Sequence, residues 1–205
     1  MKGLDRIVER LEADLDEKDR VRESTLKATR AITRLASVAI RGMHQGKDAA
    51  KDLAALRREV SALRSRLRNH PEFWFGGTAE GALQEVAEAS IVHSLLRDRP
   101  LPRPEDVGVT SAAYVLGLGD AVGELRRFAL DRMRVGQMDE ATRVVEAMED
   151  LFHAILRFDY PDGIVAVRHK QDVARSLLER TRGELAVAVR SAELEKKLAR
   201  LTRRR

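Results

Sequence analysis

The feature that most constrains this fold is the recurrence of apolar side chains at three- or four-residue intervals along the first 45 residues. This spacing places them on one face of an α-helix, whereas a strand alternates its faces at every residue. No proline interrupts the stretch. The apolar positions are Ile7, Leu11, Leu15, Ala28, Ile32, Leu35, Ala39 and Met43. We therefore expect one long amphipathic helix over about residues 2–45.

The rest of the chain continues in the same way. Proline and glycine mark the ends of five further helical segments, and we find neither an alternating strand pattern nor an internal repeat. We expect Gly46 to end the first helix and Thr110 or Ser111 to cap the fourth. The expected helices cover about residues 48–68, 78–97, 110–134, 139–157 and 164–200. The sequence thus predicts an all-α bundle of six to seven long antiparallel helices.

We interpret residues 1–205 as a single helical domain. The best candidate linker is the Pro-rich stretch 98–109, which we expect to be an extended loop. It lies between the two halves of one acidic motif, described below, so it does not separate two independent units. The basic tail 203–205 is expected to fray.

Composition excludes several classes of protein. The chain has no Cys, so it has no disulfide, thiolate metal site or Cys nucleophile. No apolar run reaches the ~20 residues of a membrane span, and no signal-peptide core is present at the start. We expect a soluble, cytoplasmic protein with no membrane partner. Its net charge of +5 and sequence pI of about 9.8 suit a nucleic-acid partner.

Two acidic pairs are the candidate catalytic feature. Glu85 and Glu88 are three positions apart, and the second pair, Asp120 and Glu124, is four apart. Residues at these spacings share a helix face. If the two helices pack side by side, the four carboxylates converge, and a cation or bound protons must offset their repulsion.

Carboxylates suit hard cations such as Mg²⁺ or Mn²⁺, which promote phosphodiester cleavage by polarising the phosphoryl group and generating hydroxide. The competing interpretation is a pair of ordinary surface acids. Against it, no Lys or Arg lies between Glu80 and Arg97, although exposed acids in a chain with 35% charged residues normally have basic neighbours. A Walker sequence and the Glu-x-x-His pairs of di-iron bundles are absent from the sequence.

A basic stripe lies on the first helix. Its five members fall within a sector of roughly 80° on a helical projection, and they are Arg20, Lys27, Arg30, Arg34 and Arg41. We interpret the stripe as a phosphate-binding surface for RNA, with a solvated helix face as the alternative. The aromatic run 73–75 either fills the core or stacks on bases, and we favour the core.

Three glycines in the fourth helix, Gly117, Gly119 and Gly123, indicate a close approach by a backbone or ligand.

The segment 114–125, Tyr-Val-Leu-Gly-Leu-Gly-Asp-Ala-Val-Gly-Glu-Leu, resembles the signature of the translin family, specifically its Trax (translin-associated factor X) branch. The segment 83–89, Leu-Gln-Glu-Val-Ala-Glu-Ala, is similar to the second Trax motif, Leu-Gln-Glu-Tyr-Val-Glu-Ala. Residues 22–33, 158–162 and 172–185 also resemble members of this family, the last two resembling archaeal ones. The likeness covers nearly the whole chain.

This resemblance implies a translin-like α-superhelical fold that assembles with copies of itself into a closed, usually octameric, shell around RNA. It implies Mg²⁺-dependent endoribonuclease activity, with catalytic, metal-binding acids at Glu85, Glu88, Asp120 and, as the fourth member, Glu124. The alternative is a non-catalytic, translin-like shell that binds single-stranded nucleic acid. Val86 replaces the aromatic residue of the Trax motif, which is expected to alter packing or substrate contact.

Overall fold

The computed structural model describes residues 3–202, in which all regular secondary structure is helical and no strand occurs. The predicted all-α class is confirmed. The helices are α1 (Leu4–His44), α2 (Ala50–Arg66), α3 (Pro71–Trp74), α4 (Gly77–Leu96), α5 (Pro104–Val107), α6 (Ser111–Arg134), α7 (Met138–Ile155) and α8 (Arg168–Thr202). The predicted frayed tail, 203–205, lies outside the described residues.

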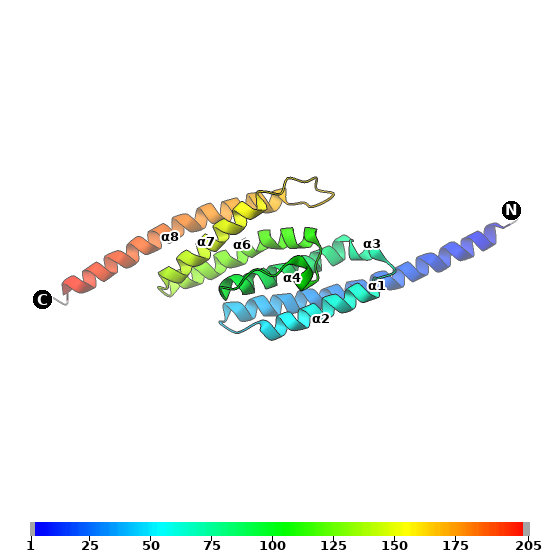
Figure 1. Ribbon diagram of the computed structural model, residues 1–205, viewed down its shortest axis with the longest axis horizontal. Helices are drawn as coiled ribbons and strands as arrows, with labels where there is room; N and C mark the ends of the chain where they lie inside the picture. The colour runs from blue at the N-terminus through cyan, green and yellow to red at the C-terminus, as the bar shows by residue number, and fades with distance from the viewer. Residues whose placement is uncertain (1–2, 203–205) are drawn as a thin grey trace.

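The helices form an elongated stack with α4 and α6 in its middle (Figure 1). Helix α6 packs against α4, α7 and α8, and α4 packs in turn against α1. Helices adjacent in sequence, such as α1 and α2, run antiparallel, as predicted (Figure 1). Helices α1, α4, α6 and α8, however, run in one direction, because the connections between them lead back along the bundle (Figure 1). This parallel arrangement places the second half of α1 beside α4 and α6, whereas the first half of α1 extends beyond them (Figure 1).

Two helix ends lie at the capping residues that the sequence predicts. Gly46 adopts a φ of 75°, in the left-handed region, directly after α1. Its N–H donates to the carbonyl of Met43 at 2.9 Å, as in other helix ends closed by glycine. At the start of α6 the hydroxyl of Thr110 accepts a hydrogen bond from the N–H of Ala113 at 3.1 Å, which satisfies one of the free donors of the first turn.

The Pro-rich connection between α4 and α6 differs from the expected extended loop. It contains the helical turn α5, and Val107 of this turn is buried in the core. The hydroxyl of Tyr114 donates to the carbonyl of Pro102 at 2.6 Å. These contacts tie the connection to the bundle, because proline restricts the backbone without preventing a single helical turn that begins with it.

The aromatic run 73–75 is partly buried, as predicted by the interpretation that it fills the core. Trp74 is buried, with the guanidinium of Arg64 5.8 Å from its ring centre. Phe75 remains exposed. Phe73 and Trp74 end the short helix α3, which precedes α4, and Trp74 contacts α2 through Arg64.

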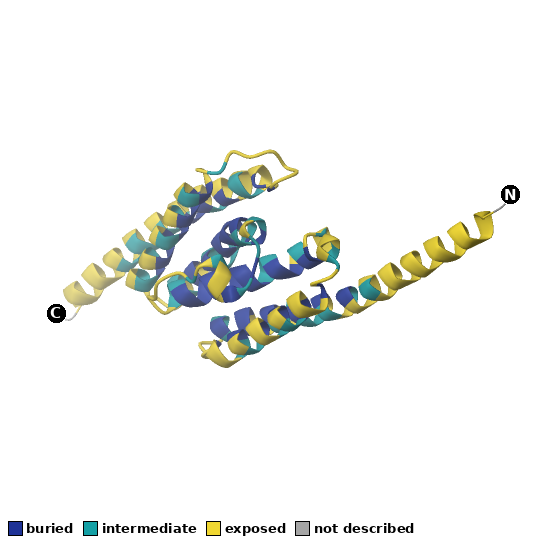
Figure 2. Ribbon diagram, turned by 45° about the vertical axis from the view of Figure 1, so that its right-hand side comes forward, coloured by how far each residue is buried: buried dark blue, intermediate teal, exposed yellow. Residues whose placement is uncertain are grey.

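The apolar face of α1 is only partly covered. From Thr25 onward this face is buried, but the side chains of Leu11 and Leu15 are 55% and 63% exposed. The early part of α1 projects beyond the other helices, as does the end of α8 at the opposite end of the molecule (Figures 1 and 2). The periodicity correctly predicted the helix, but it could not reveal where its partners end. Within residues 3–202, no helix has both the length and the apolar character needed to cross a bilayer.

Helices α4 and α6 meet most closely at Gly117. A Cβ atom added there would lie 2.7 Å from the Cβ of Ala87 and 3.0 Å from the backbone nitrogen of Glu88. At Gly119 an added Cβ would lie 2.7 Å from the Cβ of Lys170. The predicted close approach by a backbone is thus confirmed at Gly117, whereas at Gly119 the close neighbour is a side chain. The prediction is wrong for Gly123, where the nearest atom, of Leu177, is 3.9 Å away.

The two outer glycines offer a matched test of this packing. Gly117→Ala forces α4 and α6 apart and should lower the free energy of unfolding by about 1–3 kcal/mol. Gly123→Ala adds the same methyl group where there is room, and should be neutral or stabilising by up to about 1 kcal/mol. Chemical denaturation followed by circular dichroism measures both, and equal effects would contradict the assigned contact.

Candidate metal centre and nucleic-acid interface

The two acidic pairs lie on facing helices in the middle of the bundle. Helix α4 is covered by α1 on one side and α6 on the other, so the face that carries Glu85 and Glu88 is largely removed from water. Glu88 is only 9% exposed, and Glu85 is partly buried. On α6, Asp120 and Glu124 are also partly buried. The contact at Gly117 holds these two helix faces together, as the sequence predicted.

The electrostatics of Glu88 show that the acids form one cluster. Burial raises the pKa of Glu88 from an ordinary 4.5 to about 8, and the negative charges of nearby acids add to the effect. Those acids are Asp120, Glu85 and Glu124. The pKa of Glu85 is raised as well, first by burial and then by the charge of Asp120. A group of carboxylates in such surroundings favours protons or a cation.

Two side chains that the sequence analysis did not single out hold Asp120. The ammonium group of Lys170, in the first turn of α8, forms an ion pair with one carboxylate oxygen, and the amide of Gln84 donates to the other. Lys170 reaches this position because Gly119 leaves room for its Cβ. The glycine was noticed in the sequence, but its partner is 51 positions further along the chain, where no local pattern indicates it.

Glu124 also has a partner that the sequence did not reveal. The Nε2 atom of His44, at the end of α1, lies 2.6 Å from a carboxylate oxygen of Glu124. This hydrogen bond holds the pKa of Glu124 below its ordinary value, against the opposing effect of burial. His44 itself is largely buried, with its ring centre 6.1 Å from that of Phe128. The histidine therefore fixes one edge of the acidic cluster.

The acidic cluster has the composition of a site for a hard cation but not yet its geometry. Within residues 3–202, no three His, Asp or Glu side chains are placed together as ligands of one ion. Asp120 and Glu124 instead contact Lys170 and His44. The donors themselves fit, because they are carboxylate oxygens close enough together that the neighbouring charges raise the pKa values of Glu85 and Glu88. Binding of an ion requires side-chain rotation and release of Asp120 from the lysine.

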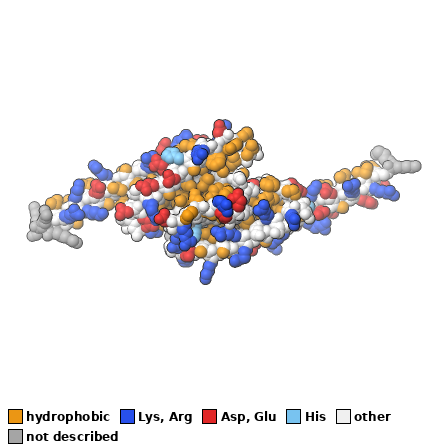
Figure 3. Space-filling model, viewed as in Figure 1, with side chains coloured by type: hydrophobic (Ala, Val, Ile, Leu, Met, Phe, Trp, Pro, Cys, Tyr) orange, Lys and Arg blue, Asp and Glu red, His pale blue; other side chains and the backbone are white. Residues whose placement is uncertain are grey.

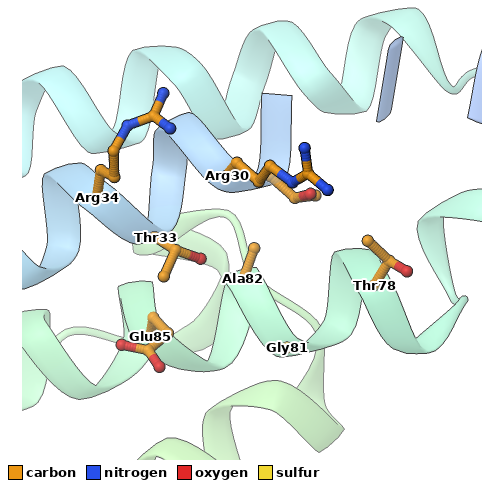
Figure 4. A pocket seen from close by; sticks show the side chains of 8 residues that line it. Arg30, Thr33, Arg34, Thr78, Gly81, Ala82 and Glu85 are labelled. Atoms are coloured by element: carbon orange, nitrogen blue, oxygen red, sulfur yellow. The ribbon is translucent and has the colours of Figure 1, made fainter. Parts of the chain in front are cut away.

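The basic stripe lies on the exposed surface of α1, beside the acidic cluster. All five of its side chains are exposed, and none forms an ion pair with an acid of the described chain. A hollow of about 490 Å³ between α1 and α4 is lined by Arg30 and Arg34 on one side and by Glu85 on the other (Figure 4). A neighbouring hollow adds Lys27 to the same two arginines. Arg20 and Arg41 line neither hollow.

Val86 takes no part in this surface. It is fully buried in the core and lines neither hollow. Its burial supports the expected effect on packing, and the expected effect on substrate contact stays a prediction.

Residues 8–182 match the Translin family, and the chain belongs to this family. An uncharacterized protein of Methanocaldococcus jannaschii is 35% identical over 191 residues, which cover 91% of this chain and 85% of that protein.

Solved structures of similar proteins agree with the fold. The AfC3PO protein in complex with duplex RNA has a TM-score of 0.82 and 31% identity, covering 95% of this chain and 98% of that one. AfC3PO solved alone has the same TM-score and 32% identity over the same shares. The fold is also that of apo-NeC3PO, with a TM-score of 0.77 at 20% identity, covering 92% of this chain and 98% of that one.

The pKa of Glu88 predicts how folding depends on pH without metal. Its carboxyl has a pKa of about 8 in the folded chain and about 4.5 in the unfolded chain. Between these values the folded state binds the proton more tightly, so stability falls as the pH rises through this window. Glu88→Gln resembles the protonated acid and should raise the unfolding temperature at pH 8. A gain of about 1 kcal/mol corresponds to about 2–4 °C in a chain of this size.

Thermal unfolding in chelator at pH 4.5 and pH 8 measures this difference. Glu146→Gln is the matched control, because Glu146 is exposed on α7. A gain for Glu88→Gln that is the same at both pH values, or that the control shares, would contradict the assignment.

Proposed function

We propose that this chain is a cytoplasmic, metal-dependent endoribonuclease of the Trax branch, which binds and cleaves RNA inside a closed shell of its own copies, octameric as in that branch. One observation carries the proposal: unpaired arginines and a member of the acidic cluster line the same hollow. Arg30 and Arg34 provide positive charge for phosphates on its α1 side, and Glu85 marks its α4 side. Phosphates held by α1 would thus lie next to the carboxylates.

Each residue of the acidic cluster and its partners has a proposed role. The metal ligands would be Glu85, Glu88 and Asp120, supported by Glu124. A divalent cation held there, Mg²⁺ or Mn²⁺, supplies polarisation of the phosphoryl group and a water of lowered pKa. His44 keeps Glu124 ionised and oriented. Lys170 neutralises part of the cluster and lies ready to contact a phosphate oxygen once Asp120 turns away.

The similarity to AfC3PO supports an RNA partner, since that protein has been solved with duplex RNA. Self-assembly of this chain is supported by its membership of the translin family, for which the resemblance implies a closed shell. The two acidic motifs, 83–89 and 114–125, support the Trax branch, because the resemblance assigns the glutamate pair to Trax and not to translin.

A second function, the non-catalytic RNA-binding shell, is favoured by a specific observation. Asp120 and Glu124 already have partners, Lys170 and His44, without any metal. A chain in which these contacts are permanent would bind RNA along α1 and leave it intact. The two functions differ in whether RNA bound in the presence of Mg²⁺ is cut.

Two variants separate binding from cleavage. Glu85→Gln removes a proposed ligand and should lower the cleavage rate at least about 100-fold, the loss typical of disturbed metal sites and catalytic electrostatics. Its RNA affinity should stay unchanged or rise, since a negative charge is removed. Arg30→Glu/Arg34→Glu should weaken binding and lower its salt dependence by about 0.7 in the log–log slope for each phosphate that the variant no longer neutralises.

Labelled single-stranded and duplex RNA, incubated with Mg²⁺, with Mn²⁺ or with chelator, provide the readout for both. Exposed residues of α7 supply the controls, Glu146→Gln and Arg143→Glu. Unchanged cleavage by Glu85→Gln would contradict the catalytic assignment. Tight binding by the native chain without product in either metal would favour the non-catalytic shell.

A further inference from the structure

The two ends of the molecule carry apolar stripes that nothing in the described chain covers. The N-terminal arm, residues 4–19 of α1, is exposed throughout. Its stripe follows the four-three-four spacing of a two-helix seam. The exposed members are Leu4, Val8, Leu11 and Leu15. They lie on the same side of α1 as the buried residues further along, so this arm extends a core-facing surface past the end of the core.

The C-terminal arm, residues 187–202 of α8, has a stripe of the same kind. Its exposed apolar members are Val187, Leu194, Leu198 and Leu201. On a helical projection this stripe faces away from the partly buried side of α8 that carries Leu185 and Val189. The chain's own helices therefore cannot cover it. All of this arm also lies beyond residues 8–182, the part that matches the Translin family.

The charges of the two arms are opposite. Residues 4–19 contain seven acids and three bases, whereas residues 187–202 contain four bases and two acids. One row beside the N-terminal stripe, at seven-residue spacing, is formed by Asp5, Glu12 and Asp19. The corresponding row beside the C-terminal stripe contains Arg190 and Lys197. Rows in these positions select partners in paired helices, because opposite charges attract and like charges repel across the seam.

We propose that the N-terminal arm of one copy pairs with the C-terminal arm of a second copy. The arms project from opposite ends of the molecule, so those of one copy cannot meet each other (Figures 1 and 3). They match in length, each spanning about 24 Å. Two N-terminal arms would oppose acid to acid, which disfavours pairing of like arms. Each copy thus offers one acidic and one basic arm, and such head-to-tail contacts form a ring when the rotation between successive copies closes.

This inference deepens the proposed function, because it rests on the self-assembly included there. Its test uses two charge reversals in the full chain. Asp5→Lys/Glu12→Lys reverses the acidic arm, and Arg190→Glu/Lys197→Glu reverses the basic arm. Each should weaken assembly by about tenfold or more, as expected when several ion pairs are replaced by repulsion. The chain that carries all four changes should regain assembly, because its arms are complementary again.

Sedimentation velocity over a range of concentrations measures these effects, and circular dichroism confirms that the exposed substitutions leave the helices intact. Leu11→Ser and Leu194→Ser should each weaken assembly, whereas Leu101→Ser, an exposed leucine outside both arms, should not. Pairing of like arms predicts no recovery in the fourfold variant, and that result would overturn the proposal.

The two proposals can fail separately. If the oligomer assembles equally well with every arm substitution, the proposed arm pairing is wrong and the proposed ribonuclease activity is unaffected. A native chain that stays monomeric overturns the arm pairing together with the shell. Loss of cleavage in Glu85→Gln, measured beside these variants, reports on the catalytic site alone.

Discussion

The close contact between α4 and α6 at Gly117 is the constraint on which the rest of this structure depends. An added methyl group at that position would lie within 3.0 Å of the α4 backbone, so the two helices can approach this closely only through glycine. Their facing surfaces bring acidic side chains together in the middle of the bundle. Two unit charges about 4 Å apart interact by about 4 kcal/mol at the dielectric constant effective near a protein surface. Repulsion on this scale is large beside a total folding stability of about 5–15 kcal/mol.

Two surrounding helices and one bound proton reduce that repulsion. Lys170 of α8 pairs with Asp120, His44 of α1 holds Glu124, and Glu88 has a pKa high enough to retain a proton near neutral pH. Each of these contacts also stands in the way of a metal ion, which must displace the lysine and the proton. The acidic cluster is therefore folded with a lysine, a histidine and a proton offsetting its negative charge. The non-catalytic RNA-binding shell corresponds to a cluster that keeps these contacts, and the ribonuclease to one that exchanges them for a metal ion.

The sequence predicted this arrangement unevenly, for physical reasons. Helix positions, the caps at Gly46 and Thr110 and the close approach at Gly117 follow from local spacing and backbone chemistry, and all were predicted. The acidic residues were predicted because charged side chains in an apolar helical segment are rare. Lys170 and His44 were missed, since each meets the cluster through tertiary packing between helices far apart in the sequence. The exposed arms were missed because an apolar stripe has the same appearance in a sequence whether or not a partner covers it.

Diffraction from crystals soaked in Mn²⁺, with anomalous data collected near the manganese edge, tests the central claim most directly. The account predicts manganese at the cluster, ligated by oxygens of Glu85, Glu88 and Asp120 at about 2.0–2.2 Å, close to the distances of Mg²⁺ sites. Lys170 should then have left Asp120. Crystals in which Lys170 remains paired with Asp120, and in which no manganese lies among the carboxylates at saturating concentration, would contradict it.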